Sequence, residues 1–535
     1  MNSWICDGIP KDGKQYPNCS GEHEPYENFG PDCVLCGLPQ EALKPGKGKP
    51  GKAGSGTTIS GPSRPSAAPL IVAIAALIAL GVGGFGIYQL ISSQGQQGKQ
   101  TENSQNHGAN SDKFVSETAT NSQFFSQGEK ILLGQTAAKQ AAAKEFAARN
   151  WQGAIAAYQQ AASSDPNDPE SKIYQNNALA RKAGNPLTIA AAVPLATDAD
   201  TTKEILRGIA QSQTEFNQSQ LAGGKLLEVV IVNYGSDLQA AGIAQDLVNA
   251  SSVLGVVGYG VNPASNQALN VYQQGGLAVL SPLTTRVSQG TLQTIPSTEK
   301  VNELLDNYLQ AAAKTLAQYA SQRYPDPPAV IFFNSDSPYS LQLKQQLVNA
   351  LPAVRGQVLK VIDISAGGFA ADTEVANAKQ LEAKVAFLAL SKNKVGEAIA
   401  IAMANRDAGS PLLLLGGDEL YNPDLLVRGG EAINGIVLAV PWSFQPGDPF
   451  AQQAVQNWKG RISWRTATAY DAAKALGDVA RQNPSRSGVA QQLSQGVQLT
   501  GSATNFQTFK EVPLVQAVRG NSGPPGSQFQ FDPVK

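Results

Sequence analysis

The sequence has little of the side-chain chemistry on which many enzymes depend. It contains only two histidines and four cysteines in 535 residues, and none of these lies beyond residue 107. The long C-terminal part therefore lacks a histidine base, a cysteine nucleophile and a histidine-ligated metal. It also shows no recognisable cofactor loop or catalytic dyad. We expect a protein that is not an enzyme and that binds no organic cofactor.

An excess of charge of one sign is also missing. The 41 basic and 42 acidic residues give a formal net charge of -1. A protein that binds nucleic acid or another polyanion usually presents a basic surface. The composition therefore predicts no nucleic-acid binding.

One long uncharged segment stands out, LIVAIAALIALGVGGFGIYQLI at residues 70–91. Its length matches the roughly 20 apolar residues that cross a hydrocarbon core. The 69 residues before it are too many for a cleaved signal peptide. A buried core helix is the alternative, but proline and polar low-complexity sequence flank the segment. We therefore predict a transmembrane helix.

The two linkers beside this segment predict its orientation. Residues 44–69 are rich in glycine and proline and carry four lysines and one arginine without an acidic residue, whereas residues 92–128 are polar and mix both signs. Basic flanks stay in the cytoplasm. We therefore expect a single-pass membrane protein with a cytoplasmic N-terminus and a periplasmic or otherwise extracytoplasmic C-terminal domain.

All four cysteines lie within residues 1–43, as WxC, a lone cysteine and CxxC. The pattern resembles small zinc-ribbon and Ran-binding-protein-type fingers, although twelve residues separate Cys6 from Cys19. A module of this size generally needs a metal or another crosslink to fold. The resemblance implies a structural zinc ion bound by Cys6, Cys19, Cys33 and Cys36. Free thiols, or His23 in place of one cysteine, are the alternatives.

Residues 129–185 are rich in alanine and have a helical pattern. The stretch NWQGAIAAYQQAASSDPN (150–167) resembles the second helix and closing turn of a tetratricopeptide repeat, with small Ala154 and Ala161 and a helix-ending Pro166. A third helix over residues 169–182 would give about one and a half repeats, fewer than the roughly three that a stable stack needs. The segment is either a docking surface for a protein partner or a helical spacer packed against the next domain.

Residues 186–535 alternate short apolar strands with amphipathic helices in two similar series, one beginning with IAAAVPL and the other with PAVIFFN. Such alternation predicts mainly parallel sheets with right-handed crossovers. The expected fold class is therefore α/β. We expect a two-lobed domain, preceded by the finger-like module, one transmembrane helix and an α-helical hairpin. Ligands of such sheets lie at the carboxyl ends of strands, where a cleft between two lobes can close on a small solute.

Seven motifs in this region carry a family resemblance when they are taken in order. They are IAAAVPLATDAD, ILRGIAQSQTEFN, VVIVNYGSD, VLGVVGYGVNPASNQAL, LAVLSPLTTRVSQ, VIFFNSDSPYSLQLKQQL and WRTATAYDAAKAL. The succession resembles the type I periplasmic binding proteins of the branched-chain amino-acid group. The resemblance implies two Rossmann-like lobes that capture an amino acid or a related small solute. Members of this family deliver the solute to an ABC permease, and receptor relatives signal its presence.

The resemblance also implies ligand contacts. In NPASN (262–266), the hydroxyl of Ser265 would hold an anion. In SPLTT (281–285), the backbone of Leu283 and the hydroxyl of Thr285 would contact the carboxylate and the amine of the ligand. Tyr339 would be a lid aromatic on the far lobe. Asp418, which directly follows an apolar strand, would pair with the ligand's ammonium group.

Some of these positions also have a purely structural interpretation. Ser265 would then cap the following helix, Tyr339 would belong to the core or the surface, and Asp418 would be a solvated helix cap. Glu419 takes the place of Asp418 if the alignment shifts by one residue. Residues 389–392 read ALSK, where the amino-acid binders tend to have a second lid aromatic. This departure weakens the assignment to branched-chain amino acids but does not affect the fold.

The leading hypothesis is a membrane-anchored solute-binding protein or receptor for a small polar ligand, linked to ABC transport or to sensing. The alternative is an envelope scaffold that no longer binds a ligand. In that case the finger and the helical segment would bind protein partners on the two sides of the membrane.

Overall fold

The computed structural model describes residues 4–7, 9–12, 26–28, 38–44, 113–220, 223–234, 237–258, 263–282, 287–288, 291–292, 298–407, 411–495, 497–498 and 512–534. The chain divides into two compact units, Met1–Gly81 and Val82–Lys535, which we describe one at a time.

In the N-terminal unit, β1 (Trp4–Cys6) pairs antiparallel with β2 (Tyr26–Asn28), and the 3-10 helix η1 (Gln40–Leu43) follows. Cys6 is buried. The other three cysteines lie outside the described residues, so the zinc site stays a prediction. The predicted transmembrane segment, residues 70–91, also lies outside them. Within the described ranges, no helix is both long and apolar enough to cross a bilayer.

The first lobe of the larger unit is built on a five-stranded sheet in the order β3-β5-β4-β6-β7, in which β3 alone runs antiparallel to its neighbour. Its strands are β3 (Phe125–Ser126), β4 (Leu187–Val193), β5 (Leu227–Asn233), β6 (Val253–Gly258) and β7 (Val279–Leu280). Its helices are α5 (Ala199–Gln220), α6 (Asp237–Asn249), α7 (Pro263–Gln274), α13 (Pro449–Trp458), α14 (Trp464–Gln482) and α15 (Arg486–Ser494).

The second lobe is built on a seven-stranded sheet in the order β11-β10-β12-β13-β14-β16-β17, in which β16 and β17 run antiparallel to their neighbours. Its strands are β10 (Pro328–Phe333), β11 (Gln357–Asp363), β12 (Val385–Ala389), β13 (Leu413–Gly416), β14 (Val437–Ala439), β16 (Leu514–Arg519) and β17 (Phe529–Pro533). Its helices are α8 (Thr298–Arg323), α9 (Pro338–Ala350), α10 (Ala371–Gln380), α11 (Val395–Asp407) and α12 (Pro423–Gly429).

Short elements complete the two lobes. A small antiparallel sheet has the order β15-β9-β8, formed by β8 (Val287–Ser288), β9 (Thr291–Leu292) and β15 (Val497–Gln498). The 3-10 helices are η2 (Val115–Glu117), η3 (Ser122–Phe124), η4 (Leu351–Val354), η5 (Lys392–Lys394), η6 (Asp418–Leu420) and η7 (Gly430–Ile433).

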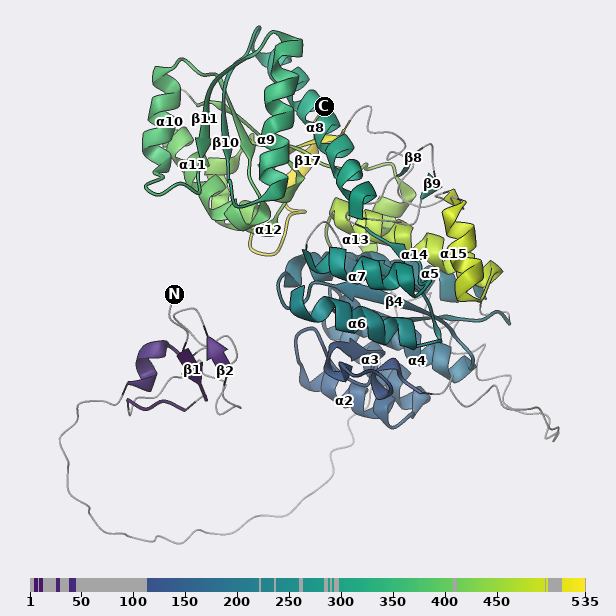
Figure 1. Ribbon diagram of the computed structural model, residues 1–535. Helices are drawn as coiled ribbons and strands as arrows, with labels where there is room; N and C mark the ends of the chain where they lie inside the picture. The colour runs from purple at the N-terminus through teal and green to yellow at the C-terminus, as the bar shows by residue number, and fades with distance from the viewer. Residues whose placement is uncertain are drawn as a thin grey trace, which may run out of the picture. The chain divides into compact units, whose positions relative to one another are not determined.

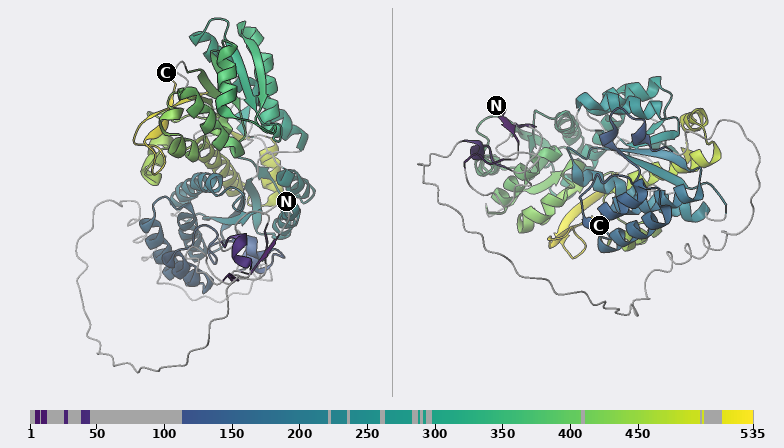
Figure 2. Two further views of the ribbon diagram at one scale, coloured as in Figure 1. Left: turned by 90° about the vertical axis from the view of Figure 1, so that its left-hand side faces the viewer. Right: turned by 90° about the horizontal axis from the view of Figure 1, so that it is seen from below.

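Helices lie on both faces of each large sheet, as Figure 1 and the two further views of Figure 2 show. In the second lobe, Ile331 and Phe387 pack with α8 and α9, whereas Phe332 and Leu388 pack with α10 and α11. In the first lobe, α6 and α7 cover one face, and α5 and α14 cover the other. Parallel strands buried on both faces are apolar throughout, which explains the continuous apolar runs in the sequence. The predicted two-lobed α/β fold is confirmed.

The helical segment before the first lobe consists of α2 (Ala137–Ala147), α3 (Trp151–Ser164) and α4 (Pro169–Ala183). Each helix packs on the next, and α4 also packs on α5 and β5. Rings of Phe146, Tyr158 and Tyr174 run through the segment in edge-on contacts. The segment therefore lies in contact with the next domain, as the spacer interpretation expects. Its likeness to a tetratricopeptide repeat stays a prediction.

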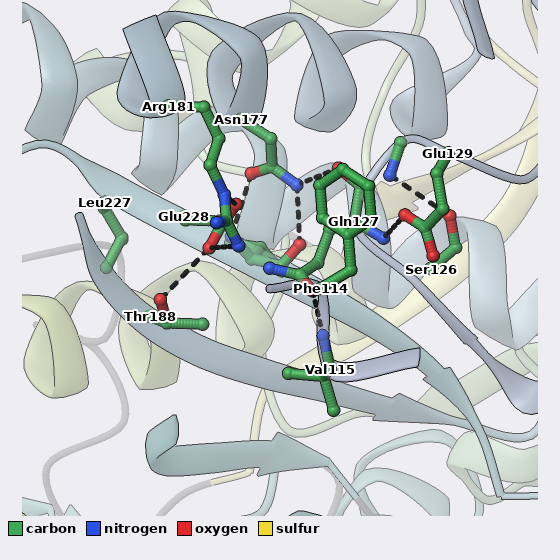
Figure 3. Close-up of polar contacts among 12 residues, drawn as sticks. Phe114, Val115, Ser126, Gln127, Glu129, Asn177, Arg181, Thr188, Leu227 and Glu228 are labelled. Atoms are coloured by element: carbon green, nitrogen blue, oxygen red, sulfur yellow. Dashed lines mark hydrogen bonds and ion pairs between the residues drawn. The ribbon is translucent and has the colours of Figure 1, made fainter. Parts of the chain in front are cut away.

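Buried polar contacts join this segment to the first lobe (Figure 3). The amide of Asn177, on α4, donates to the carbonyls of Gln127 and Val229 at 2.7 Å each and accepts the Val229 N–H at 2.9 Å. Arg181, one turn further along α4, donates its Nη2 to the carboxylate of Glu228 at 3.0 Å. Glu228 lies within β5 and is fully buried. Arg181 thus supplies the charge that Glu228 needs inside the sheet.

We expect Arg181→Ala to lower the free energy of unfolding by about 3–5 kcal/mol, because it leaves the Glu228 carboxylate buried without its cation. Arg149→Ala is the matched control. Both guanidinium groups lie over the Phe114 ring, at 5.4 and 5.3 Å from its centroid. The side chains of the Arg149–Glu117 pair are 43% and 38% exposed, against 7% and 0% for Arg181–Glu228. An exposed pair contributes at most about 1 kcal/mol. Urea denaturation of the full-length variants measures both values, and equal losses would contradict the role assigned to Glu228.

Candidate functional site

Polar side chains gather where the central strands of the second lobe end. Asn334 follows β10 and Ser391 follows β12. The amide of Asn334 donates to the Ser391 hydroxyl at 3.0 Å, and its oxygen accepts the Ser391 backbone N–H at 3.0 Å. Ser340, on α9, accepts the backbone N–H of Asn334 at 2.7 Å. These contacts fix the carboxyl edge of the sheet between β10 and β12, the position where open α/β sheets bind ligands.

Asp418 lies two residues beyond β13 and contacts Tyr339, the second residue of α9. The Tyr339 hydroxyl donates to Oδ1 of Asp418 at 2.8 Å. Gly417 makes this approach possible, because a Cβ atom at this position would lie 2.2 Å from the Tyr339 hydroxyl oxygen. The Tyr339 ring belongs to the core of the second lobe. Its hydroxyl therefore orients the carboxylate, while its ring packs between the sheet and the helices.

Burial is the main influence on the acidity of this site. It raises the pKa of Asp418, while the hydrogen bond from Tyr339 and the charge of Arg465 act in the opposite direction. Burial also raises the pKa of the neighbouring Glu419 to about 7, and the Asp418 charge adds to that rise. Two adjacent carboxylates with raised pKa values are typical of a functional site.

Two contacts connect the second lobe with the first beside these carboxylates. The Nζ of Lys392 pairs with Oδ2 of Asp198 in the first lobe at 2.6 Å. Within the second lobe, the backbone N–H of Lys392 donates to the carboxylate of Glu419 at 2.8 Å. Arg465, on α14, donates its Nη1 to the carbonyl of Tyr421 in the second lobe at 3.0 Å. The described residues of the two lobes thus meet through charged side chains.

Arg465 is the central cation of the cluster. It is buried, and its Nη1 lies 3.3 Å from a carboxylate oxygen of Glu204 on α5. Although burial lowers its pKa, the charges of Glu204, Asp418, Asp198 and Glu419 outweigh this effect and raise it. In the described part of the cluster, four carboxylates thus lie near Arg465 and Lys392, and the charge of Arg207 also acts on Glu204. A cationic group on a ligand would stabilise the ionised forms of Asp418 and Glu419 in this buried position.

The structure describes only part of the predicted site. Tyr339 and Asp418 are brought into direct contact. Ser265 lies on α7, but its side chain is outside the described residues, as are Leu283 and Thr285. The first-lobe half of the predicted site therefore stays a prediction.

Sequence reasoning missed four charged residues of the cluster: Asp198, Glu204, Lys392 and Arg465. A signal existed for Lys392, which is the lysine of ALSK, the stretch where a lid aromatic is usual. Asp198 and Arg465 lie inside motifs that carried the family resemblance. Nothing in those motifs marked either residue as part of the cleft.

Residues 186–512 match the protein family described as periplasmic binding protein, which covers more than half of the chain. The chain belongs to the periplasmic binding protein family. It is accordingly a binding protein and not an enzyme. A search of the curated proteins found no match.

Solved structures share the same two-lobed fold. One is the branched-chain amino acid transporter substrate-binding protein LivJ from Streptococcus pneumoniae in complex with isoleucine, with a TM-score of 0.50 and 16% identity over 65% of this chain and 100% of that chain. Another is an ABC transporter substrate-binding protein from Sphaerobacter thermophilus, with a TM-score of 0.51 and 15% identity over 66% of this chain and 97% of that chain. At these identities the likeness concerns the fold.

We expect the free energy of unfolding to fall as the pH rises from about 4.5 to about 7, because Glu419 ionises in the unfolded state at a lower pH than in the folded state. Its pKa is about 7 in the folded chain against an ordinary value of 4.5, so in this window the folded state holds a proton that the unfolded state has released. The stability of Glu419→Gln relative to the parent chain should therefore increase as the pH rises. Asp418→Asn removes the neighbouring charge, so the pH at which Glu419 is half ionised should fall. Urea denaturation across this pH range measures both effects. A constant difference between parent and Glu419→Gln would contradict the raised pKa.

Proposed function

We propose that the chain is an extracytoplasmic solute-binding protein whose cleft holds a small solute by its ammonium group, as an amino acid or a close analogue would offer. The observation that carries the proposal is Asp418, a buried strand-end carboxylate that Tyr339 orients. An ammonium group that leaves water needs a charge partner. Asp418 supplies one, and the strand-end position is where this architecture binds ligands.

Charged contacts between the lobes give this cleft a way to close around its ligand. Lys392 of the second lobe meets Asp198 of the first, and Arg465 meets the Tyr421 carbonyl. Closure of two lobes brings such partners together and excludes water from the solute. The closed form would then be delivered to an ABC permease or read by a sensing partner.

A thermal-shift screen of the full-length chain against amino acids, amines and small carboxylic acids tests the proposal. A ligand present at about 100 times its dissociation constant stabilises the folded state by about 2.7 kcal/mol. We expect solutes with an ammonium group to raise the melting temperature and carboxylic acids without one to leave it unchanged.

With a ligand from this screen, we expect Asp418→Asn to weaken binding by about 2–5 kcal/mol, because the change removes the charge partner of the ammonium group and keeps the side-chain shape. Asp424→Asn is the matched control, since Asp424 is exposed on the same lobe, where it pairs with Arg428. Calorimetry measures both affinities. If Glu419→Gln loses affinity and Asp418→Asn does not, the ammonium partner is Glu419. Unchanged affinity in both variants would contradict ammonium recognition at this cluster.

One observation favours the second candidate function, an envelope scaffold without a ligand. The lobes already hold each other through side chains of the chain itself, because Lys392 presents an ammonium group to Asp198. A cleft in which Lys392 supplies an ammonium group to a carboxylate needs no solute for that pairing. The absence of a thermal shift with any compound of the screen would support this candidate and contradict the first.

We also infer that residues 70–91 anchor the protein in a membrane, with the cysteine module, folded around zinc, on the cytoplasmic side. The basic linker before this segment supports that orientation. We expect protease added to sealed right-side-out vesicles to digest the large domain and to leave residues 1–43 intact, as followed with an N-terminal epitope tag. Inverted vesicles serve as the control. Digestion of the tag in right-side-out vesicles would contradict the orientation.

A further inference from the structure

A cavity lies outside the cluster of Asp418 and Glu419. It has a volume of about 480 Å³, within the range of roughly 300–1,000 Å³ that small-molecule sites occupy. One face of α5 lines it, together with the start of α12, the connection between α13 and α14, and the loop between β16 and β17. The cavity is therefore bounded by both lobes. Tyr339, Asp418, Glu419, Lys392 and Asp198 do not line it.

Two side chains that line this cavity have hydrogen-bond donors without partners among the described residues. Arg207, on α5, and Trp458, at the end of α13, both line it. The Nε of Arg207 and the Nε1 of Trp458 are buried and have no hydrogen-bond partner among the described residues. Trp458 as a whole is 3% exposed. Buried polar groups are normally satisfied, and both of these groups can only donate. They call for an acceptor that the described residues do not supply.

Positive charge collects around the same cavity. Lys203 and Lys459 line it, and their side chains, like that of Arg207, form no hydrogen bond or ion pair with another described residue. Asp200 and Glu204 also line it, but Glu204 is held by Arg465. Unpaired cations therefore outnumber unpaired carboxylates on these walls.

The positive charge around the cavity also affects the pKa of a neighbouring lysine, Lys172. The Nζ of Lys172 lies 3.8 Å from the centroid of the Trp458 ring and donates to the carbonyl of Asn457 at 2.7 Å. Burial, followed by the charges of Lys459 and Arg207, lowers the pKa of Lys172 to about 8. The repulsion that lowers this pKa is what an incoming anion would relieve.

Part of the remaining wall is formed by aromatic rings and prolines. Tyr421 and Phe531 line the cavity and stack with their ring centroids 4.5 Å apart. Prolines from the start of α12 and from the loop between β16 and β17 extend this surface. A ligand that satisfies both walls has an oxyanion at one end and a planar apolar body at the other.

We propose that this cavity, formed by both lobes around Arg207, Lys203 and Trp458, is a second binding site, which takes a small organic anion with a carboxylate or phosphate head on a flat ring. An occupant bridges the two lobes. It also reaches the cleft cluster through Arg465, which contacts Glu204 and the Tyr421 carbonyl on the cavity wall. The site does not depend on the ligand proposed for the cleft.

Calorimetry on the full-length chain with four probes tests the site. Benzoate carries a carboxylate on a ring, and adenosine monophosphate carries a phosphate on a larger ring system. Benzyl alcohol offers the ring without the charge, and inorganic phosphate offers the charge without the ring. We expect saturable binding of benzoate, adenosine monophosphate or both, and weaker binding of the other two probes. Saturable binding of either anion supports the site. If benzyl alcohol binds as well as benzoate, or neither ring-bearing anion binds, the proposal is wrong.

Variants locate the binding. Lys203→Gln and Arg207→Gln should each raise the dissociation constant of the anion by roughly tenfold or more, as the loss of a charged hydrogen-bonding partner does. Arg406→Gln, on the outer surface of the second lobe where it pairs with Asp407, is the matched control and should leave the constant unchanged. Trp458→Phe keeps an aromatic ring but removes the Nε1 donor, so it tests the site if Arg207→Gln fails to fold. Binding that survives both Lys203→Gln and Trp458→Phe but is lost in Lys392→Gln would place the anion in the cleft and overturn the proposal.

Discussion

The carboxylate of Glu228 lies inside a parallel strand that is covered on both faces, where an ion without a partner is strongly unfavourable. Arg181 supplies the opposite charge, and the hydroxyl of Thr188 donates a further hydrogen bond at 3.1 Å. Arg181 belongs to α4, which precedes the residues that match the family. Among the described residues, Arg181 of the preceding helical segment is the cation that neutralises this charge in the sheet of the first lobe. The geometry of that lobe, including the strand ends that face the cleft, depends on this segment.

The same constraint explains where the other charges lie. Strands buried on both faces leave room for charged side chains mainly at their ends, and Asp198 and Asp418 both follow strands. Two of the contacts between the lobes differ in exposure. The Lys392–Asp198 pair is partly exposed, so water screens it and it breaks at little cost. Arg465, which donates to the Tyr421 carbonyl of the second lobe, is buried and is held within the first lobe by Glu204. We therefore expect the exposed pair to open more easily than the Arg465 contact.

Much of the architecture follows from sequence patterns because strand and helix periodicities are local. The strand PAVIFFN becomes β10, and the predicted third helix over residues 169–182 becomes α4. Contacts between residues that lie far apart in the sequence do not follow from such local patterns. Lys392 and Asp198 are separated by 194 positions, and no local pattern indicates that they meet. Asp418 was identifiable because it directly follows an apolar strand. Its contact with Tyr339 depends on the space left at Gly417, which only the folded chain reveals.

The strand order of the second lobe has a consequence for how the chain is made. The polypeptide leaves this lobe after β14, builds α13, α14 and α15 on the first lobe, and then returns to add β16 and β17 beside β14. Domains generally fold from the N-terminal side during synthesis. The edge of β14 that pairs with β16 therefore stays unpaired until the ribosome has synthesised β16 and β17. An open strand edge of this kind invites pairing with other chains. A chaperone would therefore matter most when the nascent chain has been synthesised beyond α15 but β16 has not yet been added.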